Sequence, residues 1–137
     1  MDYTFGEYVI STDKSLLSID KITDLLHKSY WANQRPIETI AKSIENSFCY
    51  GIYHNHSQIG FARLVSDYAT VYWLCDVIID ENHRRIGLGK ELIRLINESE
   101  EFKGLRGILA TKDAHGLYGQ YGFEMAPEGR FMVKPAY

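Results

Sequence analysis

The spacing of apolar residues near the start of the chain predicts two amphipathic helices. Apolar side chains recur at helical intervals from Ile19 to Leu26, and Ser18 stands just before them as a possible N-cap. A second apolar stripe runs from Ile37 to Ile44, after a proline suited to a first helical turn. A short run of strand-forming residues at 8–11 precedes both helices.

After residue 46 the pattern changes to one typical of strands. The runs "SFCYGIY" and "QIGFARLV" flank the polar turn "HNHS", and "TVYWLCDVIID" follows as a third strand. An amphipathic helix is then predicted from Gly87, because Leu88, Leu92, Leu95 and Ile96 share one face. A strand "LRGILAT", a short helix "DAHGLYGQY" and a closing strand "RFMVKP" complete the order. This order predicts one α+β domain over residues 1–137, with a central, mostly antiparallel mixed sheet flanked by helices.

Composition excludes several classes of function. The 137 residues, 45% of them hydrophobic, suffice for one buried core, and a net charge of −3 argues against a nucleic-acid partner. No apolar run approaches the ~18 residues of a membrane span, so we expect no membrane partner and a cytoplasmic protein. The five histidines and two cysteines show no convergent ligand spacing, so we expect no metal.

The segment "RRIGLGK" at 84–90 has the properties of a phosphate-binding loop. A helix start offers unpaired backbone N–H groups and partial positive charge, and Gly87 and Gly89 let a ligand approach that backbone closely. Arg84, Arg85 and Lys90 add full charges nearby. A glycine-bearing loop with solvated arginines remains the alternative at this point.

Known phosphate motifs narrow the interpretation. A Walker loop needs Ser or Thr after its lysine, where this chain has Glu91, and a dinucleotide fingerprint needs a third glycine, where it has Leu92. The loop instead resembles the R-x-x-G-x-G motif of the GNAT acetyltransferase superfamily, and "DAHGLYGQYGF" at 113–123 resembles that family's A-x-x-L-Y-x-x-x-G-F segment. The two motifs stand in the family's order, and the predicted elements fit it from residue 8 onward.

The resemblance implies acetyl-coenzyme A as co-substrate and assigns residues to its binding. The pyrophosphate would lie on the loop, and the backbone of the preceding strand would meet the pantetheine arm and the thioester. The implied cofactor-binding residues are Val77, Ile78, Ile79, Arg84, Arg85, Ile86, Gly87, Leu88, Gly89 and Lys90. Arg85 stands where many members have glycine, and Thr111 where many have asparagine; neither change removes a backbone donor.

Two residues are predicted to take part in catalysis. Tyr118 matches the tyrosine that in many relatives protonates the departing thiolate; the alternative is a plain core residue. Asp76 stands where some relatives place an acid facing the substrate amine; the alternative is a carboxylate paired with a nearby cation. Arg35, in the "SYWANQRP" segment, is a further candidate to meet an acceptor's anionic group.

The resulting hypothesis is acetyl transfer to a primary amine, most simply that of a small molecule, by direct attack in a ternary complex. Neither cysteine sits in a Cys–His pattern, which fits the absence of a covalent intermediate. The alternatives are a non-catalytic acyl-coenzyme A binding module and an acetyltransferase acting on protein lysines or N-termini. Many family members dimerise, so the resemblance also makes a homodimer an expectation.

Overall fold

The computed structural model describes residues 1–136 and contains one six-stranded sheet whose strands lie in chain order. All neighbouring pairs are antiparallel except the last, which is parallel. The predicted mixed, mostly antiparallel sheet is therefore confirmed. The strands are β1 (Asp2–Phe5), β2 (Tyr8–Ser11), β3 (Phe48–His54), β4 (Ser57–Ser66), β5 (Val71–Ile79) and β6 (Arg106–Ile108).

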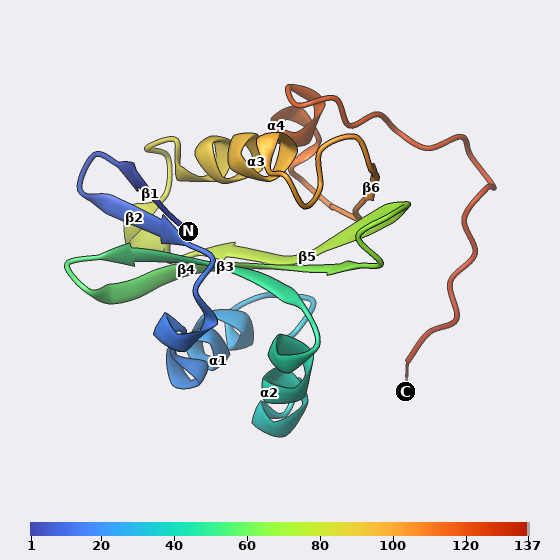
Figure 1. Cartoon of the computed structure of the whole chain (residues 1–137). Coiled ribbons are helices and arrows are strands. Elements are labelled where there is room, and N and C mark those ends of the chain that lie inside the picture. Colours follow the sequence, from blue (N-terminus) through green and yellow to red (C-terminus); the bar gives the residue numbers. More distant parts are fainter. Residues whose placement is uncertain (137) are drawn as a thin grey trace.

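Helices cover both faces of this sheet (Figure 1). The helices α1 (Ile19–His27) and α2 (Ile37–Glu45) lie on one face, and α3 (Leu88–Glu98) and α4 (His115–Gly119) lie on the other. Two short 3₁₀ turns, η1 (Lys14–Leu16) and η2 (Glu81–His83), connect elements. Each face has its own core: Ile22, Ile40 and Phe61 belong to the first, and Leu88, Leu92 and Tyr50 belong to the second.

The helices on the first face form where the apolar spacing predicts them. Ser18 caps α1, because its hydroxyl accepts a hydrogen bond from the Lys21 N–H at 3.2 Å. Pro36 stands just before α2 with φ of −64°, a value already suited to a helix start. Between them, the loop at 28–36 is held by the Ser29 hydroxyl, which donates to Leu26 O and accepts from Ala32 N.

Strands β5 and β6 pair over only three residues, from Val71 to Trp73 on β5, and then separate. A contact between a ring and a glycine fixes their register: a Cβ on Gly107 would lie 2.5 Å from the Tyr72 ring. From residue 74 to the end of β5, the backbone therefore has a strand partner on the β4 side alone. This separation leaves space between the two strands at their carboxyl ends.

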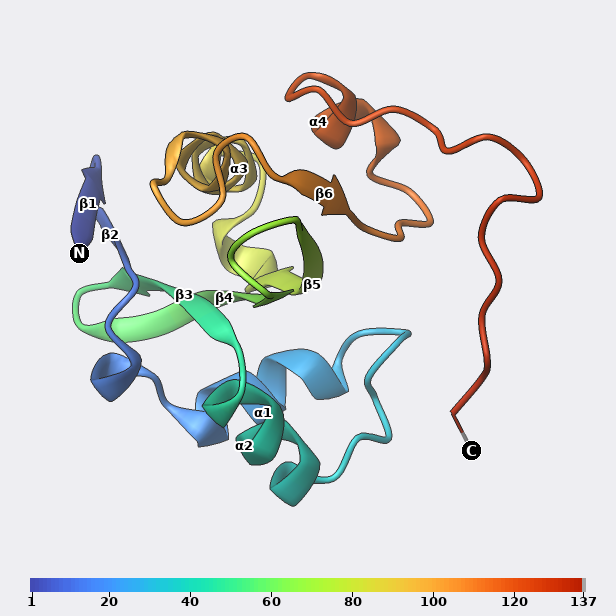
Figure 2. The same ribbon diagram turned by 45° about the vertical axis from the view of Figure 1, so that its right-hand side comes forward.

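The chain differs from the prediction at both of its ends. The predicted closing strand "RFMVKP" is wrong: residues 130–135 form no strand and run as an exposed segment away from the sheet (Figures 1 and 2). A strand needs a pairing edge, and this segment does not reach one. Conversely, β1 was not predicted; a left-handed Gly6, with φ of 59°, turns it back to pair with β2.

Candidate functional site

A β-bulge in β5 determines which way Asp76 points. Phe61 pairs with Ile78, but Arg63 pairs with Cys75, so two residues of β5 face one residue of β4. Asp76 is the extra residue and has the left-handed φ of 51°. The bulge interrupts the alternation of the strand, and Asp76 consequently faces the α1/α2 side of the sheet.

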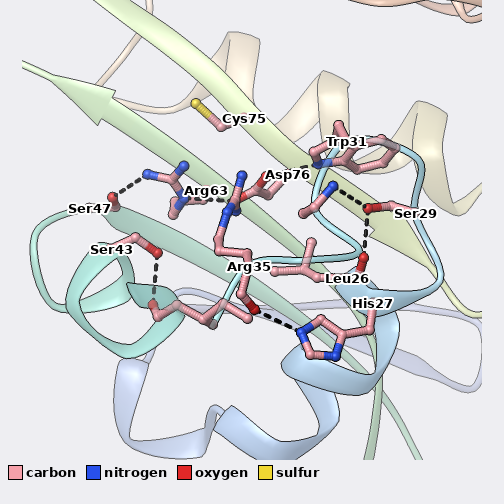
Figure 3. Close-up of polar contacts among 12 residues, drawn as sticks. Leu26, His27, Ser29, Trp31, Arg35, Ser43, Ser47, Arg63, Cys75 and Asp76 are labelled. Atoms are coloured by element: carbon pink, nitrogen blue, oxygen red, sulfur yellow. Dashed lines mark hydrogen bonds and ion pairs between the residues drawn. The ribbon is translucent and has the colours of Figure 1, made fainter. Parts of the chain in front are cut away.

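Asp76 is buried there in a network of donors (Figure 3). One carboxylate oxygen accepts from Trp31 Nε1 at 3.0 Å, and the other accepts from Arg35 at 2.8 Å and Arg63 at 2.9 Å. Burial alone would raise the pKa of Asp76, but attraction to Arg63 and Arg35 and the hydrogen bonds outweigh it, so the pKa lies below its ordinary value. Asp76 is thus a carboxylate with both oxygens engaged.

The loop at 28–36 brings two of these donors to Asp76. His27 Nε2 donates to Arg35 O at 2.8 Å, which ties the end of the loop to α1. Figure 3 shows Trp31 and Arg35 approaching the carboxylate from this loop, whereas Arg63 reaches it from β4. Arg63 was not singled out from the sequence, although a lone charge within the apolar run "QIGFARLV" was a signal that it has a partner.

A cavity of ≈ 590 Å³ opens between the separated ends of β5 and β6. One wall is the free β5 backbone from Leu74 to Val77, and the opposite wall is the segment 109–111 that follows β6. The loop at 28–36 and the start of α4 close its other sides. Its lining includes the aromatic side chains Tyr30, Trp31, Trp73 and Tyr118 and the charged side chains Arg35, Arg63, Asp76, Lys112 and Asp113.

Tyr118 lies in α4 at the border of this cavity and of a second one, of ≈ 690 Å³, along β6. Its ring packs edge-on against Phe123, with centroids 5.8 Å apart. Burial, with a smaller contribution from the negative charge of Asp113, raises the pKa of Tyr118 above its ordinary value. The phenol therefore stays protonated at neutral pH and can act as a proton donor.

The predicted phosphate loop follows the carboxyl end of β5, the end nearer to Asp76. Gly87 is the N-cap of α3 and has φ of +93°, so the fold itself favours glycine there. Gly89 is different: its φ is ordinary for an L residue, and a Cβ would make only van der Waals contacts, 3.5 Å from Leu117 and 4.0 Å from Ile79. Neither backbone conformation nor lack of space therefore requires glycine at 89.

The positively charged side chains of the loop, Arg84, Arg85 and Lys90, lie at the surface. The Arg84 Nε donates to Ile79 O at 2.9 Å, which anchors the loop to the end of β5. Arg85 and Lys90 are exposed and make no side-chain ion pair among residues 1–136. With the first N–H groups of α3, they form a positive, open helix start.

The structure thus brings some of the predicted residues together and separates others. Asp76, Val77 and Tyr118 line one cavity, whereas residues 84–90 line neither of the two cavities described. The proximity of Gly89 to Leu117, which precedes Tyr118, places the helix start beside α4. A ligand long enough to follow β5 would connect the loop with the cavity.

Other kinds of site find little support in residues 1–136. No three His, Cys, Asp or Glu side chains converge as metal ligands among them. Burial raises the pKa of Cys75, which lines the cavity, so this side chain is a thiol at neutral pH rather than a nucleophilic thiolate. No helix of the described chain has both the length and the apolar character to cross a membrane.

Comparison with known proteins identifies relatives of this chain. The acetyltransferase (GNAT) domain family matches residues 45–125. A crystal structure of a Xanthomonas campestris protein, described as belonging to the GNAT family, is 35% identical; the match covers 98% of this chain and 96% of that one, with a TM-score of 0.90. The uncharacterized ycf52-like N-acetyltransferase of Prochlorococcus marinus is 28% identical, with 93% of this chain and 72% of that protein covered. Histone acetyltransferase TAP1 of Glycine max is 27% identical, with 90% and 59% covered.

Proposed function

Because this chain belongs to the GNAT acetyltransferase family, we propose that it transfers the acetyl group of acetyl-coenzyme A to a primary amine of a small molecule. The predicted GNAT fold is confirmed by the likeness to the Xanthomonas structure. The observation that carries the proposal is the cavity between β5 and β6, where unpaired strand backbone and the Tyr118 ring face the same space. As part of the proposal, the reaction takes place in the cytoplasm.

Acetyl-coenzyme A is proposed to extend from the loop at 84–90 to this cavity. The backbone N–H groups at the start of α3, with Arg85 and Lys90, would hold the pyrophosphate. The free edge of β5 near Val77 would pair with the amides of the pantetheine arm and donate to the thioester carbonyl. Gly89 supports this path, because glycine there serves no need of the fold.

The proposed chemistry is direct aminolysis of the thioester. The neutral amine attacks the carbonyl carbon, a C–N bond forms, and the C–S bond of the tetrahedral intermediate then breaks. Tyr118 gives its proton to the departing sulfur, whose thiol has a pKa of roughly 8–9, and water takes the proton that the amine loses. The raised pKa of Tyr118 supports the role of acid, since the phenol must be protonated beforehand.

The pairing of Asp76 supports a structural role over that of a base. A carboxylate with a lowered pKa and three donors has little tendency to accept a proton from an amine. We propose instead that Asp76 holds Arg35 and Arg63 in the cavity wall, beside Trp31. The volume of ≈ 590 Å³ falls in the usual range for small-molecule sites, ~300–1,000 Å³, and supports a small acceptor.

An assay of free thiol release tests the function and separates it from its alternatives. The enzyme with acetyl-coenzyme A is given a panel of small amines, a lysine peptide and a peptide with a free N-terminus. Faster thiol release with small amines, confirmed by mass spectrometry of the acetylated product, supports the proposal. Release stimulated only by peptides would identify a protein acetyltransferase. Binding of acetyl-coenzyme A without stimulation by any amine would identify a binding module.

A further inference from the structure

Two arginines in the wall of the cavity between β5 and β6 share a single carboxylate. Arg35 and Arg63 donate to the same oxygen of Asp76, at 2.8 and 2.9 Å, and its other oxygen accepts from the uncharged indole of Trp31 (Figure 3). Neither arginine forms another ion pair among residues 1–136. One negative charge therefore balances two positive charges, and this wall keeps an excess of one positive charge.

The excess charge is partly withdrawn from water. The Arg35 side chain is 24% exposed and the Arg63 side chain 14%. The other charged residues of the lining, Lys112 and Asp113, are exposed and opposite in sign, so they leave the excess unchanged. Water and salt screen partly buried charges less than charges on an open surface. An anionic group of a ligand would complete the charge balance that Asp76 completes only in part.

Arg35 has the unused donors that a carboxylate ligand needs. It donates to Asp76 through Nη1, and its Nε and Nη2 atoms donate to no acceptor among residues 1–136. These two atoms form one edge of the guanidinium group, an edge that pairs with both oxygens of a carboxylate through parallel hydrogen bonds. Arg63 already donates from Nε to Asp76 and from Nη1 to Ser47 Oγ, at 3.1 Å. Arg35 is therefore the better anchor, and Arg63 adds charge beside it.

Large aromatic side chains line the same cavity and are only partly covered. Tyr30 is 59% exposed, Trp31 42% and Trp73 40%. The rings of Tyr30 and Trp31 pack edge-on with their centroids 5.1 Å apart, and the bond from Trp31 to Asp76 holds the indole in place. Aromatic surface beside a few fixed polar groups is typical of a small-molecule site, where it contacts the apolar part of the ligand.

From these contacts we propose that the acceptor is a primary amine that also carries a carboxylate on an aromatic or apolar skeleton. The carboxylate pairs with Arg35 beside Arg63, the skeleton lies against Trp31 and Trp73, and the amine points into the space between β5 and β6. One excess positive charge matches a carboxylate better than a phosphate monoester, whose charge at pH 7 is about −1.5 to −2. The role of this amine as acceptor rests on the acetyl-transfer proposal, whereas its recognition by Arg35 does not.

Calorimetry with matched acids and amides tests carboxylate recognition apart from acetyl transfer. The full chain, in the presence of coenzyme A, is titrated with meta- and para-(aminomethyl)benzoate, with phenylalanine, and with the carboxamide of each. We expect at least one acid to bind at least about tenfold more tightly than its amide, a difference of ~1.4 kcal/mol. Equal affinities in every pair, or no binding by any acid, overturn the proposal. Phosphoethanolamine binding more tightly than every acid overturns it too, because the site then prefers a phosphate.

The variant Arg35→Gln assigns the preference to this residue. It removes the charge and the paired edge, so the affinity for the acid should fall at least about tenfold while the affinity for the amide stays the same. Asp76 keeps Arg63 as a partner, and unchanged binding of coenzyme A verifies the fold. The matched control is Arg130→Gln, at an exposed position that lines neither cavity; it should keep the wild-type preference. A preference that persists undiminished in Arg35→Gln overturns the proposal.

Thiol release from acetyl-coenzyme A with the same pairs separates this inference from the acetyl-transfer proposal. A kcat/KM at least about tenfold higher for the acids than for their amides supports both. Release that is as fast with the amides supports acetyl transfer and overturns carboxylate recognition. Preferential binding of an acid in calorimetry, without release by any amine, supports carboxylate recognition and overturns acetyl transfer.

Discussion

Replacing Gly89 by alanine should raise the stability of the protein while it weakens binding of acetyl-coenzyme A. Gly89 is the second residue of α3, and an added Cβ would meet Leu117 at 3.5 Å, an ordinary contact. Glycine within a helix is about 0.5–1 kcal/mol less favourable than alanine, so Gly89→Ala should increase the free energy of unfolding by about that amount.

The effect on the ligand should have the opposite sign. If the pyrophosphate approaches the backbone at the start of α3, the methyl group of alanine occupies part of that path. We expect the dissociation constant to rise at least about tenfold, which corresponds to ~1.4 kcal/mol. Gly87 would be a poorer choice for this test, because its φ of +93° makes any substitution strained and confuses folding with binding.

Thermal unfolding without ligand and calorimetry with acetyl-coenzyme A measure the two effects separately. The melting temperature should rise by about 2–4 °C for a chain of this size. Gly116→Ala is the matched control: this glycine is exposed in α4, and a Cβ there would meet nothing within 4 Å. The control should gain stability and keep its affinity. Unchanged affinity in Gly89→Ala would refute the path over α3, and a loss of stability would show that the fold needs this glycine.

Four further outcomes are expected. Tyr118→Phe should lower kcat, by no more than the ~10²–10⁴-fold that acid catalysis usually contributes. The loss of kcat should be smaller with acyl donors whose thiol has a lower pKa, and an equal loss with every donor would contradict the role of acid. Asp76→Asn should lower the free energy of unfolding, measured in urea, by about 2–4 kcal/mol. This is somewhat below the ~3–5 kcal/mol of a fully buried pair, because Arg35 and Arg63 keep partial exposure. Calorimetry should show a nearly unchanged affinity for acetyl-coenzyme A, and a variant as stable as wild type would show that the ion pairs contribute nothing. The pKa of Asp76 is lower in the folded state, so the carboxylate stabilises the fold above its ordinary pKa near 4, and this stabilisation is lost as the pH falls below that value. Urea titrations below about pH 4 should therefore show wild type losing more stability than Asp76→Asn. Equal losses in the two proteins would refute the stabilising role of the Asp76 carboxylate. Arg84→Ala should weaken acetyl-coenzyme A binding in calorimetry less than Gly89→Ala does, because Arg84→Ala leaves the approach to the backbone N–H groups of α3 open. A larger loss of affinity in Arg84→Ala would place the main contact on the arginine.

The sequence predicted the helices well because their apolar spacing reports directly on packing. The stripe from Ile37 to Ile44 is long enough to leave little ambiguity, and α2 spans nearly the same residues. Strands at the ends of the chain were less predictable, because a short strand exists only where an edge accepts it. The pattern "RFMVKP" predicts a strand in isolation, and nothing in that pattern says whether its partner lies in the same chain.

For the candidate site, residue types were predictable but their orientation was not. Tyr118 borders the cavity between β5 and β6, and its role as an acid stays a prediction. The partners of Asp76 depend on a bulge that the regular alternation of "VYWLCDVII" conceals, and on Arg63 from a neighbouring strand. Long-range pairings of this kind follow from register, which a single sequence does not specify.

The extra residue in β5 makes this strand more sensitive to changes of length than to changes of identity. The number of residues between Cys75 and Ile78 determines the face of the sheet on which Asp76 lies. Deleting Val77 would remove the bulge, so Ile78 would keep its pairing with Phe61, but Asp76 would turn toward α3 and lose Arg35 and Arg63 as partners. We therefore expect a library of substitutions at Val77 to yield many folded proteins and a single-codon deletion at the same position to yield none.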